Sequence, residues 1–175
     1  MSEPKWDTAR LSSGEKCVLK RNAGVMMCSA SMQAIEAFYR AQSKQCKSYE
    51  ESAWFAALCM QCLWREEDHP SIKLFPEMLQ AIYQNPEATD STRKRCTNFL
   101  DLCWADDGFL LGKICNLVRK MKADHPEIMP DFCALADDFI HWNQENHSVQ
   151  RQWLNTICRT TNEGNEIEEE ESHVD

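Results

Sequence analysis

The segment ESAWFAALCMQCLW, residues 51–64, decides the fold class of this chain. Apolar side chains stand at positions 55, 58, 59, 62 and 63, which is the i, i+3, i+4, i+7, i+8 spacing of an amphipathic helix. Ser48 and Glu51 form a capping-box pattern that would start this helix, and Pro70 would end it. Its apolar run, residues 53–63, is far shorter than the ~20 residues that a membrane-spanning helix needs.

Helical spacing continues on both sides of this segment, so the sequence predicts an all-α fold of about eight helices. The chain has only five Gly, six Pro and five Val against thirteen Leu, which argues against a turn-rich β protein. Helix boundaries are predicted from capping patterns, prolines and the apolar stripes. The predicted helices run from Ser12 to Gly24, over 31–42, from Ser48 to Pro70, over 71–83, from Asp90 or Ser91 through 104, from Asp106 through 121, and over 131–142 and 148–159.

Two helical subdomains and a tail are predicted. Asn85-Pro86 starts a loop, which places the boundary between subdomains 1–88 and 89–160. Residues 161–175 hold seven acidic residues and no Lys or Arg, the composition of a disordered, self-repelling tail. Without them the net charge changes from −9 to −2, because 19 basic residues face 21 acidic ones. An acidic total argues against non-specific nucleic-acid binding, but a nearly neutral body leaves it open.

Ten cysteines would form a disulfide framework in a secreted chain of this size. Residues 1–7 contain no apolar signal-peptide core, so we expect the reducing cytoplasm, with most cysteines serving as small buried apolar residues. Cys59-x-x-Cys62 lies within the apolar stripe of its predicted helix and lacks the second pair that a structural zinc site uses. We therefore favour packing, although a metal or redox protein built on Cys and His stays an alternative.

The sequence lacks the motifs of common enzyme classes. It contains no G-x-G-x-x-G, Walker A, G-x-S-x-G or H-E-x-x-H pattern. Glu66-x-x-His69 and Asp138-x-x-His141 resemble half of a di-metal site, but the first abuts Pro70 at a helix end and the second uses Asp. We therefore expect no enzyme activity, no metal and no cofactor.

Basic residues cluster locally despite the net negative charge. Charge runs are usually solvent-facing, and cations are favourable near the C-terminus of a helix. Residues 93–95, Arg-Lys-Arg, are predicted in the first turn of a helix instead, where they would oppose its dipole. Phosphate is the obvious ligand to favour positive charge there.

Several segments, in order along the chain, resemble the CasB family, the small subunit of the type I-E CRISPR surveillance complex Cascade. The resemblance covers about residues 9–160. The matching segments are Leu11-x-x-Gly14, Leu19-Lys20-Arg21, residues 35–40 (IEAFYR), residues 93–95 followed by 99–104 (FLDLCW), residues 139–142 (FIHW) and residues 149–153 (VQRQW). The high cysteine content and the glutamate-rich tail depart from the family's pattern.

The resemblance implies a non-catalytic subunit made of two packed helical halves. It implies that two copies form a head-to-tail dimer beside the other Cascade subunits, which hold the guide RNA. The subunit would stabilise the R-loop by holding the guide–target heteroduplex and the displaced DNA strand. The implied partners are therefore other Cascade subunits, a second copy of itself, guide RNA and target DNA, with no membrane.

Ten basic residues are predicted to contact nucleic-acid backbones. Arg21 and Arg40 rest on matching segments, and the others rest mainly on where the charge lies. Lys113 and Lys120 stand seven apart, nearly two helical turns, and so share one flank of their helix. The predicted residues are Lys20, Arg21, Arg40, Arg93, Lys94, Arg95, Lys113, Arg119, Lys120 and Arg151. A helical adaptor that binds only protein is the alternative.

Overall fold

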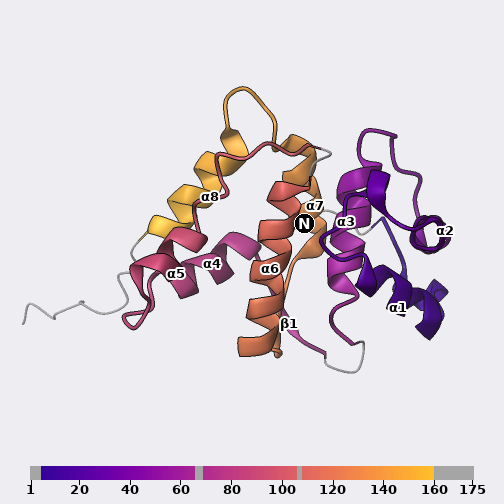
Figure 1. Cartoon of the computed structure of the whole chain (residues 1–175), viewed down its shortest axis with the longest axis horizontal. Helices are drawn as coiled ribbons and strands as arrows, with labels where there is room; N and C mark the ends of the chain where they lie inside the picture. The colour runs from indigo at the N-terminus through magenta and orange to yellow at the C-terminus, as the bar shows by residue number, and fades with distance from the viewer. Residues whose placement is uncertain (1–4, 66–68, 106–107, 160–175) are drawn as a thin grey trace, which may run out of the picture.

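Helices dominate the computed structural model, which describes residues 5–65, 69–105 and 108–159 (Figure 1). The all-α prediction is confirmed, since these ranges contain eight α-helices, two short 3-10 helices and one two-stranded sheet. The predicted tail, residues 161–175, lies outside the described residues, as do Asp106 and Asp107. The elements are η1 Thr8–Arg10, α1 Ser13–Arg21, η2 Met27–Ser29, α2 Met32–Ala41, α3 Glu51–Gln61, β1 Ser71–Lys73, α4 Phe75–Tyr83, α5 Asp90–Arg95, α6 Phe109–Asp124, β2 Ile128–Pro130, α7 Phe132–His141 and α8 Ser148–Cys158.

Helix α3 is buried on every side. All side chains of residues 53–60 are buried, so the predicted single apolar stripe is wrong for this helix. Helices α1, α2, α6 and α7 and η2 all contact α3, which leaves no solvent-facing side for polar residues. In Figure 1, α1, α2 and α3 lie at one end of the molecule, α4, α5 and α8 at the other, and α6 and α7 between them.

A short parallel sheet joins two connecting segments that are distant in sequence. β1 pairs with β2 in the register Ser71↔Ile128, Ile72↔Met129 and Lys73↔Pro130. The predicted helix starting at Ser71 is therefore wrong over its first residues. Helix α4 begins at Phe75 with Pro76 in its first turn, where a missing backbone N–H does no harm.

A helix begins where the sequence predicts if the predicted capping residue forms its hydrogen bonds. Ser12 and Glu15 form the predicted capping box, with the Ser12 N–H donating to Glu15 Oε2 over 2.8 Å. Ser48 makes no such cap, because α3 starts at Glu51. Helix α5 is capped by Thr89, one residue earlier than predicted, and ends after six residues.

Helix α2 buries only part of its apolar residues. Met32 and Tyr39 are exposed, and the buried face of α2 consists of Phe38 and three alanines. Small alanine side chains allow close approach, and this helix packs against α1.

Aromatic rings form the core at the other end of the molecule. Trp153 of α8 contacts Phe75 of α4 and Trp142, which follows α7, with ring centroids 5.3 and 5.1 Å apart. Phe99, which follows α5, packs on both tryptophans. Helices α4 and α8 therefore pack together across the predicted boundary at residues 88 and 89, as do α3 and α7. The division into two subdomains stays a prediction.

No helix in the described ranges is both long enough and apolar enough to cross a membrane.

Two glycines allow a matched test of backbone strain. Gly24 has a φ of +86°, and an added Cβ would lie 3.1 Å from Cys115 Cβ and Sγ. We expect Gly24→Ala to lower the free energy of unfolding by about 1–3 kcal/mol, because an L side chain is strained at this φ. Gly112→Ala is the control, since nothing lies within 4 Å of its added Cβ and Ala favours the interior of α6 by about 0.5–1 kcal/mol. Urea unfolding of both variants checks the opposite signs; equal effects would contradict them.

Asp138 makes stability depend on pH. Burial raises the pKa of its carboxyl from 3.8 to about 6, although the Trp153 ring N–H donates to it over 2.8 Å. The folded chain therefore binds this proton more tightly than the unfolded chain does, and the contribution to stability is lost as the pH rises through about 6. Between pH 5 and 8, the wild type should lose about 1 kcal/mol more than Asp138→Asn in urea unfolding. Asp101→Asn, at an exposed carboxylate, should follow the wild type; parallel curves for all three proteins would refute this role.

Candidate nucleic-acid interface

A hollow of about 260 Å³ lies between the end of α5 and one face of α6. We call it the basic hollow, because three of its lining residues are cationic, two are asparagines and none is acidic. On α6, the lining residues follow the 3- and 4-residue spacing of one helical face. The lining is Arg95, Asn98, Lys113, Asn116, Leu117 and Lys120.

The charges in the basic hollow are only partly neutralised within the chain. Lys120 Nζ pairs with Asp124 Oδ2 at 2.7 Å, one turn along α6. The side chains of Arg95 and Lys113 are exposed and make no ion pair with another described residue. Guanidinium and ammonium groups with adjoining amides can all donate hydrogen bonds, so this lining suits an anion with several acceptor oxygens.

The sequence prediction missed the two asparagines. Asn116 had a signal, since it lies between Lys113 and Lys120 on the same face of α6. Asn98 had none, because only the fold brings the segment after α5 to the same hollow as α6.

Residues 93–95, which we call the basic turn, form the last turn of α5 and not its first. The prediction placed them against the helix dipole, and this is wrong because the helix is six residues long and starts at Asp90. Cations are favourable at a helix C-terminus. The helix dipole therefore gives no reason for phosphate to bind at this turn, and the surrounding contacts decide each residue's role.

Arg93 connects α5 to the end of α4. Its Nε donates to the Tyr83 carbonyl over 3.1 Å, and its Nη2 donates to the Asn85 carbonyl over 3.3 Å. Lys94 and Arg95 are exposed, and their side chains make no such contact within the described residues. The basic turn thus combines one structural cation with two that face solvent.

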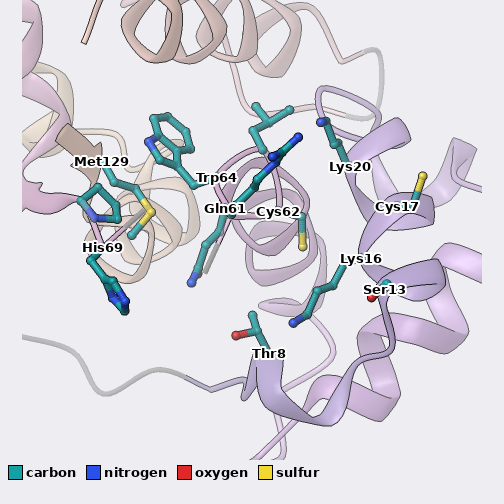
Figure 2. Close-up of a pocket in the computed structure, with 13 residues that line it drawn as sticks. Thr8, Ser13, Lys16, Cys17, Lys20, Gln61, Cys62, Trp64, His69 and Met129 are labelled. Carbon is teal, nitrogen blue, oxygen red and sulfur yellow. The ribbon is translucent and has the colours of Figure 1, made fainter. Parts of the chain in front are cut away.

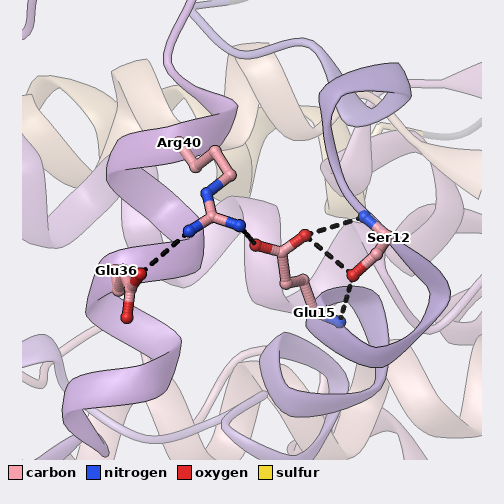
Figure 3. Close-up of polar contacts among 4 residues, drawn as sticks. All are labelled: Ser12, Glu15, Glu36 and Arg40. Atoms are coloured by element: carbon pink, nitrogen blue, oxygen red, sulfur yellow. Dashed lines mark hydrogen bonds and ion pairs between the residues drawn. The ribbon is translucent and has the colours of Figure 1, made fainter.

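Arg40 is held between two carboxylates (Figure 3). Its guanidinium lies 2.5 Å from Glu15 Oε1 and 2.8 Å from Glu36 Oε1, which joins α2 to α1. Hydrogen bonds from Ser12 lower the pKa of Glu15, and the charge of Arg40 lowers it further. Although Arg40 is among the residues with the strongest family resemblance, its charge is balanced inside this chain.

The Arg119 Nη2 donates to the Ala23 carbonyl over 3.1 Å. The side chains of four of the ten predicted residues therefore bind a carboxylate or a backbone carbonyl of the described chain: Arg40, Arg93, Arg119 and Lys120. The remaining six side chains are exposed and have no ion pair or hydrogen bond to another described residue. These six are Lys20, Arg21, Lys94, Arg95, Lys113 and Arg151. Among all ten, the structure gathers Arg95, Lys113 and Lys120 into the basic hollow.

A second hollow, of about 570 Å³, lies between α1 and the end of α3 (Figure 2). Lys16 and Lys20 reach it from one face of α1, with Arg65 and His69 also in its lining and Trp64 and Met129 as apolar walls. The sequence EED at residues 66–68 follows Arg65 directly. The lining residues therefore do not fix the charge of this hollow, and we assign no ligand to it.

The cysteines are less uniformly buried than predicted. Four are buried, two are partly buried and four are exposed. Burial raises the pKa of Cys96 to about 11, which keeps its thiol protonated and weakly reactive. Cys59 is buried within α3, which supports packing as its role, and the described residues include no group of three or more metal-ligating side chains.

The difference between Arg93 and Lys94 can be tested by alanine substitution. We expect Arg93→Ala to lower the free energy of unfolding by about 1–2 kcal/mol, because two backbone carbonyls lose their donor. Lys94→Ala, the control in the same turn, should change it by less than about 0.5 kcal/mol. Thermal and urea unfolding check both values; equal losses would show that Arg93 is not a structural cation.

Comparisons with known proteins identify the family. The model of the family described as CRISPR-associated protein Cse2 matches residues 15–156. CasB from M. ruber has a similar crystal structure, with a TM-score of 0.63 and 14% identity over 85% of this chain and 86% of CasB. A chain of a solved CRISPR RNA-guided surveillance complex gives a TM-score of 0.63 and 16% identity over 83% of this chain and 82% of its own. Among curated proteins, no sequence matches this chain.

The two structural likenesses, at these identities, establish a shared fold. The family match covers most of the chain, from α1 almost to the end of α8. The chain therefore belongs to the CRISPR-associated Cse2 (CasB) family, as the sequence resemblance predicted.

Proposed function

We propose that this chain is a non-catalytic small subunit of a CRISPR RNA-guided surveillance complex of the Cascade type. In this role, its exposed cations would bind nucleic-acid backbones and stabilise the R-loop. The observation that carries the proposal is the basic hollow, where Arg95, Lys113 and Lys120 converge without an acidic residue in the lining. Family membership supports the setting, and a similar fold occurs in a solved surveillance complex.

The chemistry of the hollow suits phosphate contacts that do not depend on base sequence. R-loop formation exchanges one duplex for another of similar stability, so modest protein contacts to the backbones can tip the balance. Lys and Arg that neutralise phosphates release counterions, which gives affinity without reading the bases. Within an assembled complex, the effective concentration of nucleic acid is high, and a few such contacts are enough.

The proposed partners are guide RNA, target DNA, the other subunits of the complex and a second copy of this chain. Lys20, Arg21, Lys94 and Arg151 are further proposed contacts, because all four are exposed cations without a side-chain partner in the described residues. Arg40, Arg93 and Arg119 stay proposed contacts only through the parts of their guanidinium groups that their internal partners leave open.

A helical adaptor without nucleic-acid contact is the second candidate. An apolar groove of about 840 Å³ favours it, with walls that include Trp6, Met129 and Phe132. Ile72 and Leu74 border the groove and are 62% and 43% exposed, so they extend its apolar surface to the solvent. This groove is suited to a protein neighbour, and the charge of the basic hollow would then be incidental.

Reversing charges in the basic hollow distinguishes the two candidates. The double variant Arg95→Glu/Lys113→Glu, assembled into the complex, should bind target DNA at least about tenfold more weakly at low salt, whatever its sequence. The slope of log K against log salt should fall by about 1.5–2, because two phosphate contacts are lost.

Lys47→Glu is the matched control, since Lys47 is an exposed cation that lines neither the basic hollow nor the apolar groove. It should leave both affinity and slope unchanged. Gel filtration must show that every variant still enters the complex. If the double variant assembles and binds DNA with an unchanged slope, the basic hollow makes no phosphate contact and the result favours the adaptor function.

A further inference from the structure

The described chain ends beside the basic turn. The backbone carbonyl of Arg159 accepts hydrogen bonds from two side chains of the α4 region, Gln80 Nε2 at 2.6 Å and Gln84 Nε2. Gln84 stands between Tyr83 and Asn85, whose carbonyls hold Arg93. Figure 1 shows α8 beside α4, with which it packs, and α4 in turn contacts α5. Arg159, the last described residue, and Arg93 of the basic turn are therefore both bonded to the segment at the end of α4.

The charges on the two sides of this junction are opposite. Residues 160–175 contain seven carboxylates and no Lys or Arg. The nearby surface carries Lys94, Arg95 and Lys113, whose side chains have no ion-pair partner among the described residues. A run of four consecutive glutamates, residues 168–171, repels itself and gains from any neighbouring cations.

The length of the segment is sufficient for contact. Sixteen residues span about 24 Å as a helix and at most about 55 Å when fully extended. Arg93, the first residue of the basic turn, donates a hydrogen bond to Tyr83, the neighbour of Gln84 in sequence. Arg95, in the same turn, lines the basic hollow.

We infer that the acidic segment, residues 163–171, binds back on the basic turn and basic hollow and competes there with nucleic-acid phosphate. A tether this short gives an effective concentration in the millimolar range, so a weak contact suffices to lower loose binding of nucleic acid. Nucleic acid held within an assembled complex would displace the segment. The competition with nucleic acid rests on the proposed function. The contact between residues 163–171 and the basic turn and basic hollow does not depend on it.

Carbodiimide cross-linking tests the contact directly, because it joins a carboxylate to an amine without a spacer. In full-length protein at low salt, mass spectrometry should find residues 163–171 linked to Lys94, Lys113 or Lys120 within monomer-sized product. These links should disappear at 0.5 M salt, because an exposed ionic contact is screened. The Lys5–Glu50 pair, at 2.7 Å, is the internal positive control.

Three results would overturn the contact: no tail links when Lys5–Glu50 is linked, links only in dimer-sized product, or equal linking to Lys16 and Lys20 on α1.

The competition has a separate readout. The full-length variant with Gln at residues 168–171 should bind a fluorescent 20-nucleotide single strand at 50 mM salt at least about threefold more tightly than the wild type does, with the difference lost at high salt. An equal, measurable affinity would overturn the competition. If cross-links form but neither protein binds DNA, the proposed nucleic-acid function fails for the free subunit while the contact stands.

Discussion

The need to cover α3 on all sides organises the rest of the molecule. Aromatic contacts reach it from separate elements, with Trp6 against Trp54 at 5.2 Å and Phe38 against Phe55 at 5.7 Å. Full burial of each such ring stabilises the fold by about 2–3 kcal/mol. This free energy favours packing of the N-terminal segment, α2 and α7 around α3. The helices that cover α3 turn their apolar side chains toward it. Their charged side chains therefore lie on the outer surface of the molecule.

Internal partners divide those cations into two kinds. Arg40, Arg93 and Arg119 each connect elements of the fold through carboxylates or backbone carbonyls. Lys113 and Arg95 make no such contact with another described residue, and both line the basic hollow. The proposed nucleic-acid surface thus consists of cations that have no structural role in the described part of the fold. The planar guanidinium of Arg is used more often for internal contacts, because it can donate to several acceptors at once.

The sequence predicted most helices because their local signals are strong. The capping box at Ser12 and the apolar stripe of α6 both appear as expected. Its errors have a common cause, which is tertiary packing that no local pattern encodes. The β1–β2 pairing replaced the start of a predicted helix, and burial on all sides removed the predicted polar face of α3. The basic hollow was half-predictable: Lys113 and Lys120 share a helix, but Arg95 and Asn98 join them only through the fold.

The pairing of α3 with α7 also matters while the protein is being made. Eighty residues separate the end of α3 at Gln61 from the end of α7 at His141. At about 5–20 residues per second, translation leaves roughly 4–16 s between the two. During that time α3 on the nascent chain lacks α7, the helix with which it packs most extensively. The ribosome-bound intermediate therefore exposes apolar surface, to which molecular chaperones can bind.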